Sequence, residues 1–465
     1  MKNRSTNGSA GPVGGYSRAR SQCAGVVRES GQIAVLAGPL IVSQVSQVAM
    51  GFTDTVMAGR IGATDLAAIA LGSSLWFPVY LACVGLLMAL SPTVAQIVGA
   101  GRVSRTGSVF RQGLWLAFFA GFLAFPVVRR LDALMGWIDI DTPIASLAGG
   151  YLDAVSWGMP AICVYLVFRF VSEGIGQTRP VMYIQIVALG LNALGNYILM
   201  FGKFGAPALG AVGAGWATAI VMWLDALMIA AWVWFHPRYV PLRLFQRLPL
   251  PDRCELGRLV RLGTPMAAGI VIEVGLFSAI SLLMGSLGAE AVAAHQIALN
   301  YSALMFMIPL GLSMAVTIRV GHAVGSADPD GVRRAGWTGV AMGAMAMSVS
   351  AAVMLWVPDG IVSLYIRDEA VRTIAVGLLT MAAMFQVADG IQVCALGALR
   401  GMKDTVVPMW MTFVSYWVVG LSLAYALGIH YRFGPRGLWS GLVISLAVAA
   451  VLLSLRFYRL SRRDI

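Results

Sequence analysis

The sequence predicts an all-α polytopic membrane protein, in which twelve transmembrane helices form two six-helix bundles related by a parallel pseudo-two-fold repeat. Of the 465 residues, 58% are hydrophobic and only 12% are charged, whereas soluble proteins carry about 25% charged residues. Apolar segments of roughly 20 residues, long enough to cross a bilayer as helices, recur from residue 33 onwards. An internal repeat, described below, gives the division into two bundles.

The apolar segments are separated by charged or glycine-rich and proline-rich stretches, and each segment is predicted to be one span. Residues 1–32 are rich in Gly, Ser and Arg and lack the apolar core of a signal peptide, so we predict a disordered tail there. We place the N-terminal bundle at 33–235, a linker at 236–260 and the C-terminal bundle at 261–460. The predicted spans are 33–58, 67–98, 112–128, 148–172, 181–201, 207–235, 261–287, 291–320, 335–357, 372–398, 406–428 and 437–457.

The net charge of +12 is distributed unevenly between the two sides of the predicted membrane. Of the 33 Lys and Arg residues, 25 fall in the two terminal segments and in alternate loops, which all lie on one side. The positive-inside rule therefore predicts that both termini are cytoplasmic. Because the basic charge follows the topology, we do not expect a nucleic-acid partner. The five cysteines are scattered and form no metal-binding or redox motif.

The second half of the chain repeats the pattern of the first at a constant offset. Without gaps, residues 36–99 match residues 262–325 at 16 of 64 positions, and Pro39, Gly59 and Gly99 fall on Pro265, Gly285 and Gly325. Each half would contain six helices, so both halves enter the membrane from the same side. Parallel repeats of this kind are found in secondary transporters, which bind their substrate between the halves. The two prolines could bend the first helix of each half.

Five acids lie inside predicted spans, and Glu273 is the most conspicuous, in the segment PMAAGIVIEVGLFSAISLLM. A carboxylate at the centre of a spanning helix costs about 2.5–3.5 kcal/mol. No Lys lies within a predicted span, and Arg169, near the end of one, is the nearest candidate for a fixed counter-charge. Each acid is therefore expected to be protonated, to bind a cation or to face water. The five acids are Asp54, Asp153, Asp225, Glu273 and Asp389.

Glu273 and Asp389 are one carboxylate each from the 261–287 and 372–398 spans. Together with hydroxyl or carbonyl oxygens they could bind Na⁺, since hard cations prefer oxygen ligands. If they share a proton instead, they would make an H⁺ site with coupled titration, and the spacing does not choose between the two ions. Asp153 is close to a span end and is expected at the interface, whereas the pattern gives no role for Asp225.

Asp54, in GFTDTVMAGRIGATDLAAIALG, is either a functional acid or an interfacial helix cap. Asn192 and Asn196, in LGLNALGNYIL, are four residues apart and so share one helix face. Paired asparagines also hold membrane helices together by hydrogen bonding, so both a functional and a packing role remain open for them.

Longer motifs resemble the NorM-like branch of the multidrug and toxic-compound extrusion (MATE) family. They are GFTDTVMAGRIGATDLAAIALGSSLWFP, LSPTVAQIVGAG, GKFGAPALGAVGAGWATAIV, VAAHQIALNYSALMFMIPLGLSMAVTIRVGHAVG and ALRGMKDTVVP. The resemblance implies an antiporter of the bacterial inner membrane that exports cationic and aromatic drugs and dyes in exchange for Na⁺ or H⁺. It implies a coupling-ion site at Glu273 and Asp389, a substrate-linked or proton-linked cluster at Asp54, Asn192 and Asn196, and no cofactor.

One residue departs from the family pattern. Some relatives have a tyrosine four residues before the acid of the 372–398 span, and here that position is Phe385, which has no oxygen to offer an ion. We expect a monomer in contact with membrane lipid. The alternatives are a flippase for an anionic lipid-linked precursor, for which the intramembrane charge has the wrong sign, and a membrane-embedded enzyme. The spans contain no catalytic motif and no nucleotide-binding Walker A sequence.

Overall fold

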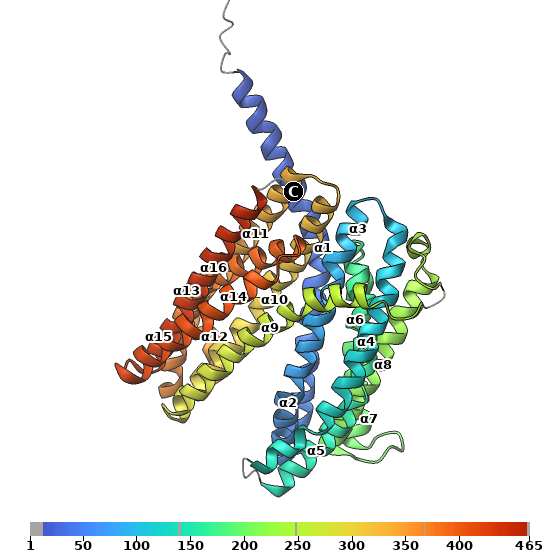
Figure 1. Ribbon diagram of the computed structural model, residues 1–465. Helices are drawn as coiled ribbons and strands as arrows, with labels where there is room; N and C mark the ends of the chain where they lie inside the picture. The colour runs from blue at the N-terminus through green and yellow to red at the C-terminus, as the bar shows by residue number, and fades with distance from the viewer. Residues whose placement is uncertain (1–12, 138–140, 247–248, 367, 463–465) are drawn as a thin grey trace, which may run out of the picture.

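The computed structural model describes residues 13–137, 141–246, 249–366 and 368–462, and in these ranges the chain is built from helices (Figure 1). Uninterrupted apolar segments form helices because a helix satisfies its own backbone hydrogen bonds in lipid. The long helices are α1 (Val13–Gly59), α2 (Ala63–Leu87), α3 (Leu90–Gly99), α4 (Thr106–Arg129), α5 (Thr142–Ser156), α6 (Met159–Gly174), α7 (Arg179–Phe201), α8 (Gly210–Phe235), α9 (Arg253–Gly285), α10 (Ala289–Gly325), α11 (Pro329–Trp356), α13 (Glu369–Gly401) and α16 (Gly434–Ser461).

Shorter elements complete the fold. Three 3₁₀ segments, η1 (Val103–Arg105), η2 (Leu131–Trp137) and η3 (Pro237–Leu242), lie in connections, and α12 (Pro358–Ser363) precedes α13. One further span alternates between α-helical and π-helical geometry through α14 (Val406–Phe413), η4 (Val414–Gly420), α15 (Leu421–Tyr425) and η5 (Ala426–His430).

The predicted number of spans is confirmed. In the described ranges, eleven helical segments are long and apolar enough to cross a membrane, and the pair α5 and α6, bent by 46°, makes a twelfth if it is one span. The structure also divides the predicted 67–98 span into α2 and α3, which meet at residues 88–89. Hydropathy could not show these breaks because the residues on both sides of them are apolar.

The N-terminal tail differs from the prediction. Helix α1 extends back to Val13, so the described part of the range 1–32 is helical rather than disordered. Glu29 is buried and forms an ion pair with Arg319 of α10 at 2.7 Å. This pairing lets the helix continue through a polar sequence. Similarly, α9 begins at Arg253, within the predicted linker, where the Asp252 side chain caps it by accepting a hydrogen bond from the Cys254 backbone N–H at 2.8 Å.

The two bundles meet at the end of the molecule where both described termini lie, which we call the terminal side, and they diverge toward the opposite, distal side (Figure 1). The first helix of each half crosses between them. The early part of α1 packs in the C-terminal bundle through Ile33, Ala37 and Leu40. The early part of α9 packs in the N-terminal bundle through Leu259 and Met266. Pro39 and Pro265 therefore lie where each helix passes from one bundle to the other.

The sequence repeat is also a repeat of contacts. A Cβ added at Gly85 of α2 would strike the backbone of Ala267 in α9, and one added at Gly311 of α10 would strike the backbone of Ile41 in α1. In the repeat alignment, Gly311 is the counterpart of Gly85, and Ala267 is the counterpart of Ile41. Because the same close approach of two helices occurs in both halves, the predicted pseudo-two-fold relation is confirmed.

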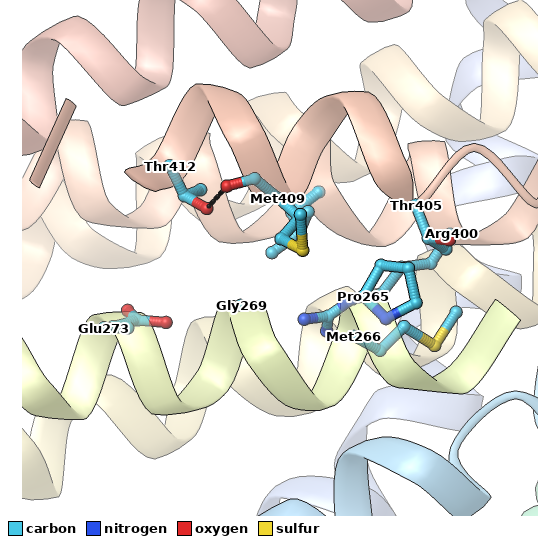
Figure 2. A pocket seen from close by; sticks show the side chains of 9 residues that line it. Pro265, Met266, Gly269, Glu273, Arg400, Thr405, Met409 and Thr412 are labelled. Carbon is cyan, nitrogen blue, oxygen red and sulfur yellow. Dashed lines mark hydrogen bonds between the residues drawn. The ribbon is translucent and has the colours of Figure 1, made fainter. Parts of the chain in front are cut away.

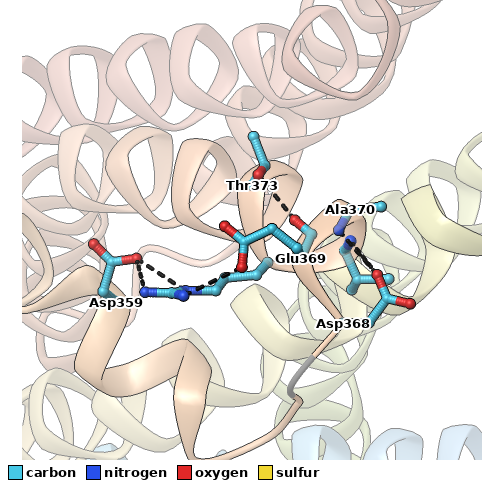
Figure 3. A network of polar contacts seen from close by, with 7 residues as sticks. Asp359, Asp368, Glu369, Ala370 and Thr373 are labelled. Atoms are coloured by element: carbon cyan, nitrogen blue, oxygen red, sulfur yellow. Dashed lines mark hydrogen bonds and ion pairs between the residues drawn. The ribbon is translucent and has the colours of Figure 1, made fainter.

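Polar side chains set the start of α13 on the distal side (Figure 3). The Asp368 carboxylate accepts hydrogen bonds from the backbone N–H groups of Ala370 at 2.9 Å and Val371 at 3.2 Å, which satisfies donors that a helix start leaves unpaired. Arg372 pairs with Asp359 at 3.0 Å, linking α12 to α13. This capping anchors the distal end of the helix that carries Asp389.

Candidate coupling-ion site

Glu273 lies in the middle of α9 and faces a small cavity between α9, α13 and α14 (Figure 2). The cavity volume is about 20 Å³, enough for one water-sized species. On the opposite wall are Thr412 and Met409 of α14, and the Thr412 hydroxyl donates to the Met409 carbonyl at 2.8 Å. A site of this size can hold one small ion, and it excludes a drug-sized molecule.

Asp389 is buried in α13 and belongs to a chain of polar side chains. Gln392 donates from Nε2 to the Asp389 carboxylate at 3.4 Å, and it accepts from the Tyr416 hydroxyl at 2.7 Å. The residue after Tyr416, Trp417, donates from Nε1 to the carbonyl of Ile272, next to Glu273, at 3.1 Å, so the same segment contacts the helices of both acids. The structure therefore brings together the two acids that the sequence paired. Phe385 instead packs its ring on Trp439, at 5.7 Å between centroids.

Arg400 was not expected in this site. The predicted span ended at residue 398, but α13 continues to Gly401, and the Arg400 side chain is buried and lines the same cavity as Glu273. Among the described residues, Arg400 makes no ion pair within 4 Å and no side-chain hydrogen bond. The expectation that only Arg169 could supply a fixed counter-charge is therefore wrong. With both acids ionised, the three groups carry a net charge of −1.

The predicted cluster in the N-terminal bundle is also assembled. Asn196 of α7 donates from Nδ2 to Asp54 of α1 at 2.5 Å and lies 3.4 Å from Asn192 Oδ1. Asn192 and Asn196 are buried, Asp54 is half-buried, and the Asn196 carbonyl oxygen has no partner among the described residues. The cluster thus joins α1 to α7 and leaves a buried acceptor that an O–H or N–H donor could satisfy.

The remaining intramembrane acids differ in their surroundings. Asp153 is exposed and pairs with Arg129 at 2.7 Å, as expected for an interfacial residue. Arg169 is buried, pairs with Glu173 at 2.8 Å and donates to Gln44 of α1 at 2.7 Å. Glu173 fell one residue outside the predicted span and was missed.

Asp225 is buried in α8, and its Oδ1 has no hydrogen-bond partner among the described residues. No cluster of three or more His, Cys, Asp or Glu side chains that could hold a metal ion occurs in the part of the chain that the structure describes. A cation at Glu273 and Asp389 would therefore need hydroxyl, amide or backbone oxygens as further ligands. Thr412, which lines the cavity with Glu273, and Gln392 and Tyr416, which are linked to Asp389, are candidates to supply them.

The sequence profile of the MatE family matches the chain twice, over residues 39–198 and 265–426. The chain belongs to the MatE family. The first match begins at Pro39 and the second at Pro265, two positions that the sequence repeat aligns with each other.

Three similar bacterial proteins have names that refer to multidrug resistance. The chain is 44% identical to a "Probable multidrug resistance protein NorM" of Xanthomonas campestris, over 94% of this chain and 95% of the relative. It is 44% identical to the multidrug resistance protein PmpM of Pseudomonas aeruginosa, over 93% and 92%. It is 42% identical to the multidrug resistance protein MdtK of Yersinia enterocolitica, over 94% and 96%.

Solved structures agree on the fold. A eukaryotic MATE transporter, AtDTX14, superposes with a TM-score of 0.85 at 20% identity, over 95% of this chain and 99% of that one. An outward-facing multidrug resistance MATE transporter of the MOP superfamily also gives 0.85, at 22% identity, over 93% and 96%.

Proposed function

We propose that the protein is a multidrug efflux antiporter that exports cationic and aromatic compounds in exchange for Na⁺ or H⁺. The multidrug resistance relatives support efflux. The observation that carries the exchange scheme is the pair of acids, Glu273 and Asp389, neither of which forms an ion pair within 4 Å among the described residues. Arg400 offsets only one of the two negative charges, and the remaining charge is costly in a low-dielectric interior. A visiting cation relieves that cost.

The net charge of the site suggests how many ions are exchanged. Glu273 and Asp389 together carry −2 when ionised, and Arg400 contributes a charge of +1 that it cannot lose by deprotonation. One Na⁺ or one H⁺ therefore neutralises the site. Binding of that ion removes the attraction that a cationic drug would feel. The coupling is reciprocal, so a bound drug weakens ion binding by the same factor.

The arrangement of the bundles supports an orientation for this cycle. The terminal side carries the excess of Lys and Arg, and we infer that it faces the cytoplasm, with both termini there. In this conformation the bundles meet on that side, so the state described is one that can release a drug outward. Rocking of the two halves about the crossing points of α1 and α9 would then expose the ion site to the cytoplasm.

We further propose that the protein acts as a monomer in the bacterial inner membrane, because one chain supplies both acids, the Asn cluster and both bundles. Transport would then need neither a nucleotide nor a second subunit.

Dye export from proteoliposomes tests the proposal. With a Na⁺ gradient or an H⁺ gradient imposed in separate experiments and no nucleotide present, the wild-type protein should export a cationic dye against its gradient. Asp389→Asn should abolish the ion-driven part, and the matched control Asp153→Asn, which removes an exposed acid, should retain it. Unimpaired ion-driven export by a folded Asp389→Asn protein would overturn the assignment.

A further inference from the structure

A second, larger cavity lies on the terminal side between the two halves of the chain. Its volume is about 540 Å³, within the range of pockets that bind small ligands. One wall comes from the N-terminal half, with Thr93 and Ile97 of α3 and Arg105 of η1. The other wall comes from the start of α9 and from the connection between α13 and α14. A ligand bound here would contact both halves at once.

The cavity is lined by four cations, Arg105, Arg258, Arg261 and Lys403, and by two acids. Both acids already have partners. Glu255 is shared by Arg258 at 2.9 Å and Arg105 at 3.9 Å. Asp404 pairs with Arg456, which lies outside the cavity, at 2.8 Å.

Arg261 and Lys403 are left without a counter-charge. Among the described residues, neither has a carboxylate within 4 Å or donates a side-chain hydrogen bond. The cavity therefore carries an excess of positive charge that this chain does not neutralise.

The Lys403 side chain is exposed, and its backbone holds it in an unusual conformation at the edge of the cavity. Its φ angle is 61°, in the left-handed region that side chains other than Gly rarely adopt. The loop fixes this geometry through hydrogen bonds from Lys403 N to Arg400 O at 2.9 Å and from Asp404 N to Leu399 O at 3.0 Å. Desolvation lowers the pKa of the Lys403 ammonium. Glu255 opposes that effect, and the positive charges of Arg105 and Arg258 add to it.

We propose that this cavity binds a phosphate-bearing anion, either the headgroup of an anionic phospholipid or free phosphate. Guanidinium groups bind phosphate oxygens in pairs, and an ammonium adds a point charge. Basic pockets between transmembrane helices at the cytoplasmic surface bind anionic headgroups. Because Arg105 belongs to one half and Arg261 and Lys403 to the other, the bound anion favours the conformation in which the halves are closed on this side.

The test compares a double variant, Arg261→Gln with Lys403→Gln, with a matched control, Arg179→Gln with Arg459→Gln. The control removes two exposed cations of the terminal side that lie outside the cavity. Thermal unfolding is measured for the full chain in detergent with rising inorganic phosphate at constant ionic strength, and for the chain in phosphatidylcholine vesicles with and without phosphatidylglycerol. Each cation near a surface contributes about 1 kcal/mol to anion binding, so the cavity variant should bind about 30-fold more weakly.

The two arms separate the sources of the anion. Stabilisation by inorganic phosphate that the cavity variant loses and the control keeps would identify free phosphate as a ligand. The same pattern with phosphatidylglycerol vesicles alone would identify the lipid headgroup. Equal stabilisation of the cavity variant and the control in both arms, or stabilisation in neither arm, would overturn the proposal. Because the readout is stability rather than efflux, this result is independent of the transport assay.

Discussion

Alanine at position 99 should force the two halves of the chain apart on the terminal side. A Cβ at Gly99, the last residue of α3, would lie 2.8 Å from the carbonyl carbon and Cα of His322 in α10 and closer still to its carbonyl oxygen. The repeat supplies the equivalent contact, in which a Cβ at Gly325 would lie 2.8 Å from the carbonyl carbon of Gln96 and 2.9 Å from Ala100 N. These are backbone atoms, so no side chain can rotate away.

The size of the effect follows from this geometry. Carbon atoms pack at about 3.5–4.0 Å, so the two helices must separate by about 1 Å to accept the methyl group. Overpacking of this kind costs about 1–3 kcal/mol, and the cost falls only on the conformation in which α3 and α10 touch. The equilibrium between closed and open terminal sides should therefore shift about 5-fold to 150-fold toward the open side.

Distance measurements between spin labels at Ser104 and Asp330 would report this shift, since these exposed residues lie on the terminal side in different halves. Gly99→Ala and Gly325→Ala should each increase the population with a long distance. Gly257→Ala is the matched control, because a Cβ there meets nothing within 4 Å. Unchanged distance distributions in folded Gly99→Ala and Gly325→Ala proteins would refute the reasoning.

Two further perturbations probe the N-terminal bundle. Asp54→Asn removes the charge that accepts the Asn196 hydrogen bond; we expect slower dye export with little loss of thermal stability, and an unaltered export rate would count against a transport role. Arg169→Met leaves Glu173 buried and unpaired, which should lower the free energy of unfolding by about 3–5 kcal/mol. Arg129→Met breaks only an exposed pair and should cost less than about 1 kcal/mol; equal losses in denaturant titrations of the two variants would contradict this ranking.

The sequence was sufficient for the parts of the fold that depend on apolar length and on repetition. The twelve spans and the pairing of the two halves follow from runs of about 20 apolar residues and from the aligned prolines and glycines, and both are seen in the structure. The grouping of Glu273 with Asp389, and of Asp54 with Asn196, could be predicted because an isolated polar group in an apolar span requires a partner.

Arg400 and Glu173 could not be placed from hydropathy alone. Each lies where a predicted span ends, and a charged residue at a span end is equally compatible with the interface. What buries them is protein rather than lipid: Glu173 is covered because Arg169 pairs with it, and Arg400 because α9 and α14 close over it. Tyr416 and Gln392 were missed because their contribution depends on contact between helices that are distant in sequence. The sequence did offer one signal for Gln392: it is a polar residue only three positions after the intramembrane acid Asp389, close enough on a helix to contact it.

The crossing of α1 and α9 has a consequence for how such a chain could have arisen. Each half packs part of its first helix inside the other half. A single repeat alone would therefore expose an apolar groove, and part of its own first helix would have nothing to pack against. Two identical copies could fill each other's grooves, since both repeats enter the membrane from the same side. A half-length ancestor would then have been stable only as a reciprocally swapped dimer, and gene duplication would have converted that dimer into one polypeptide.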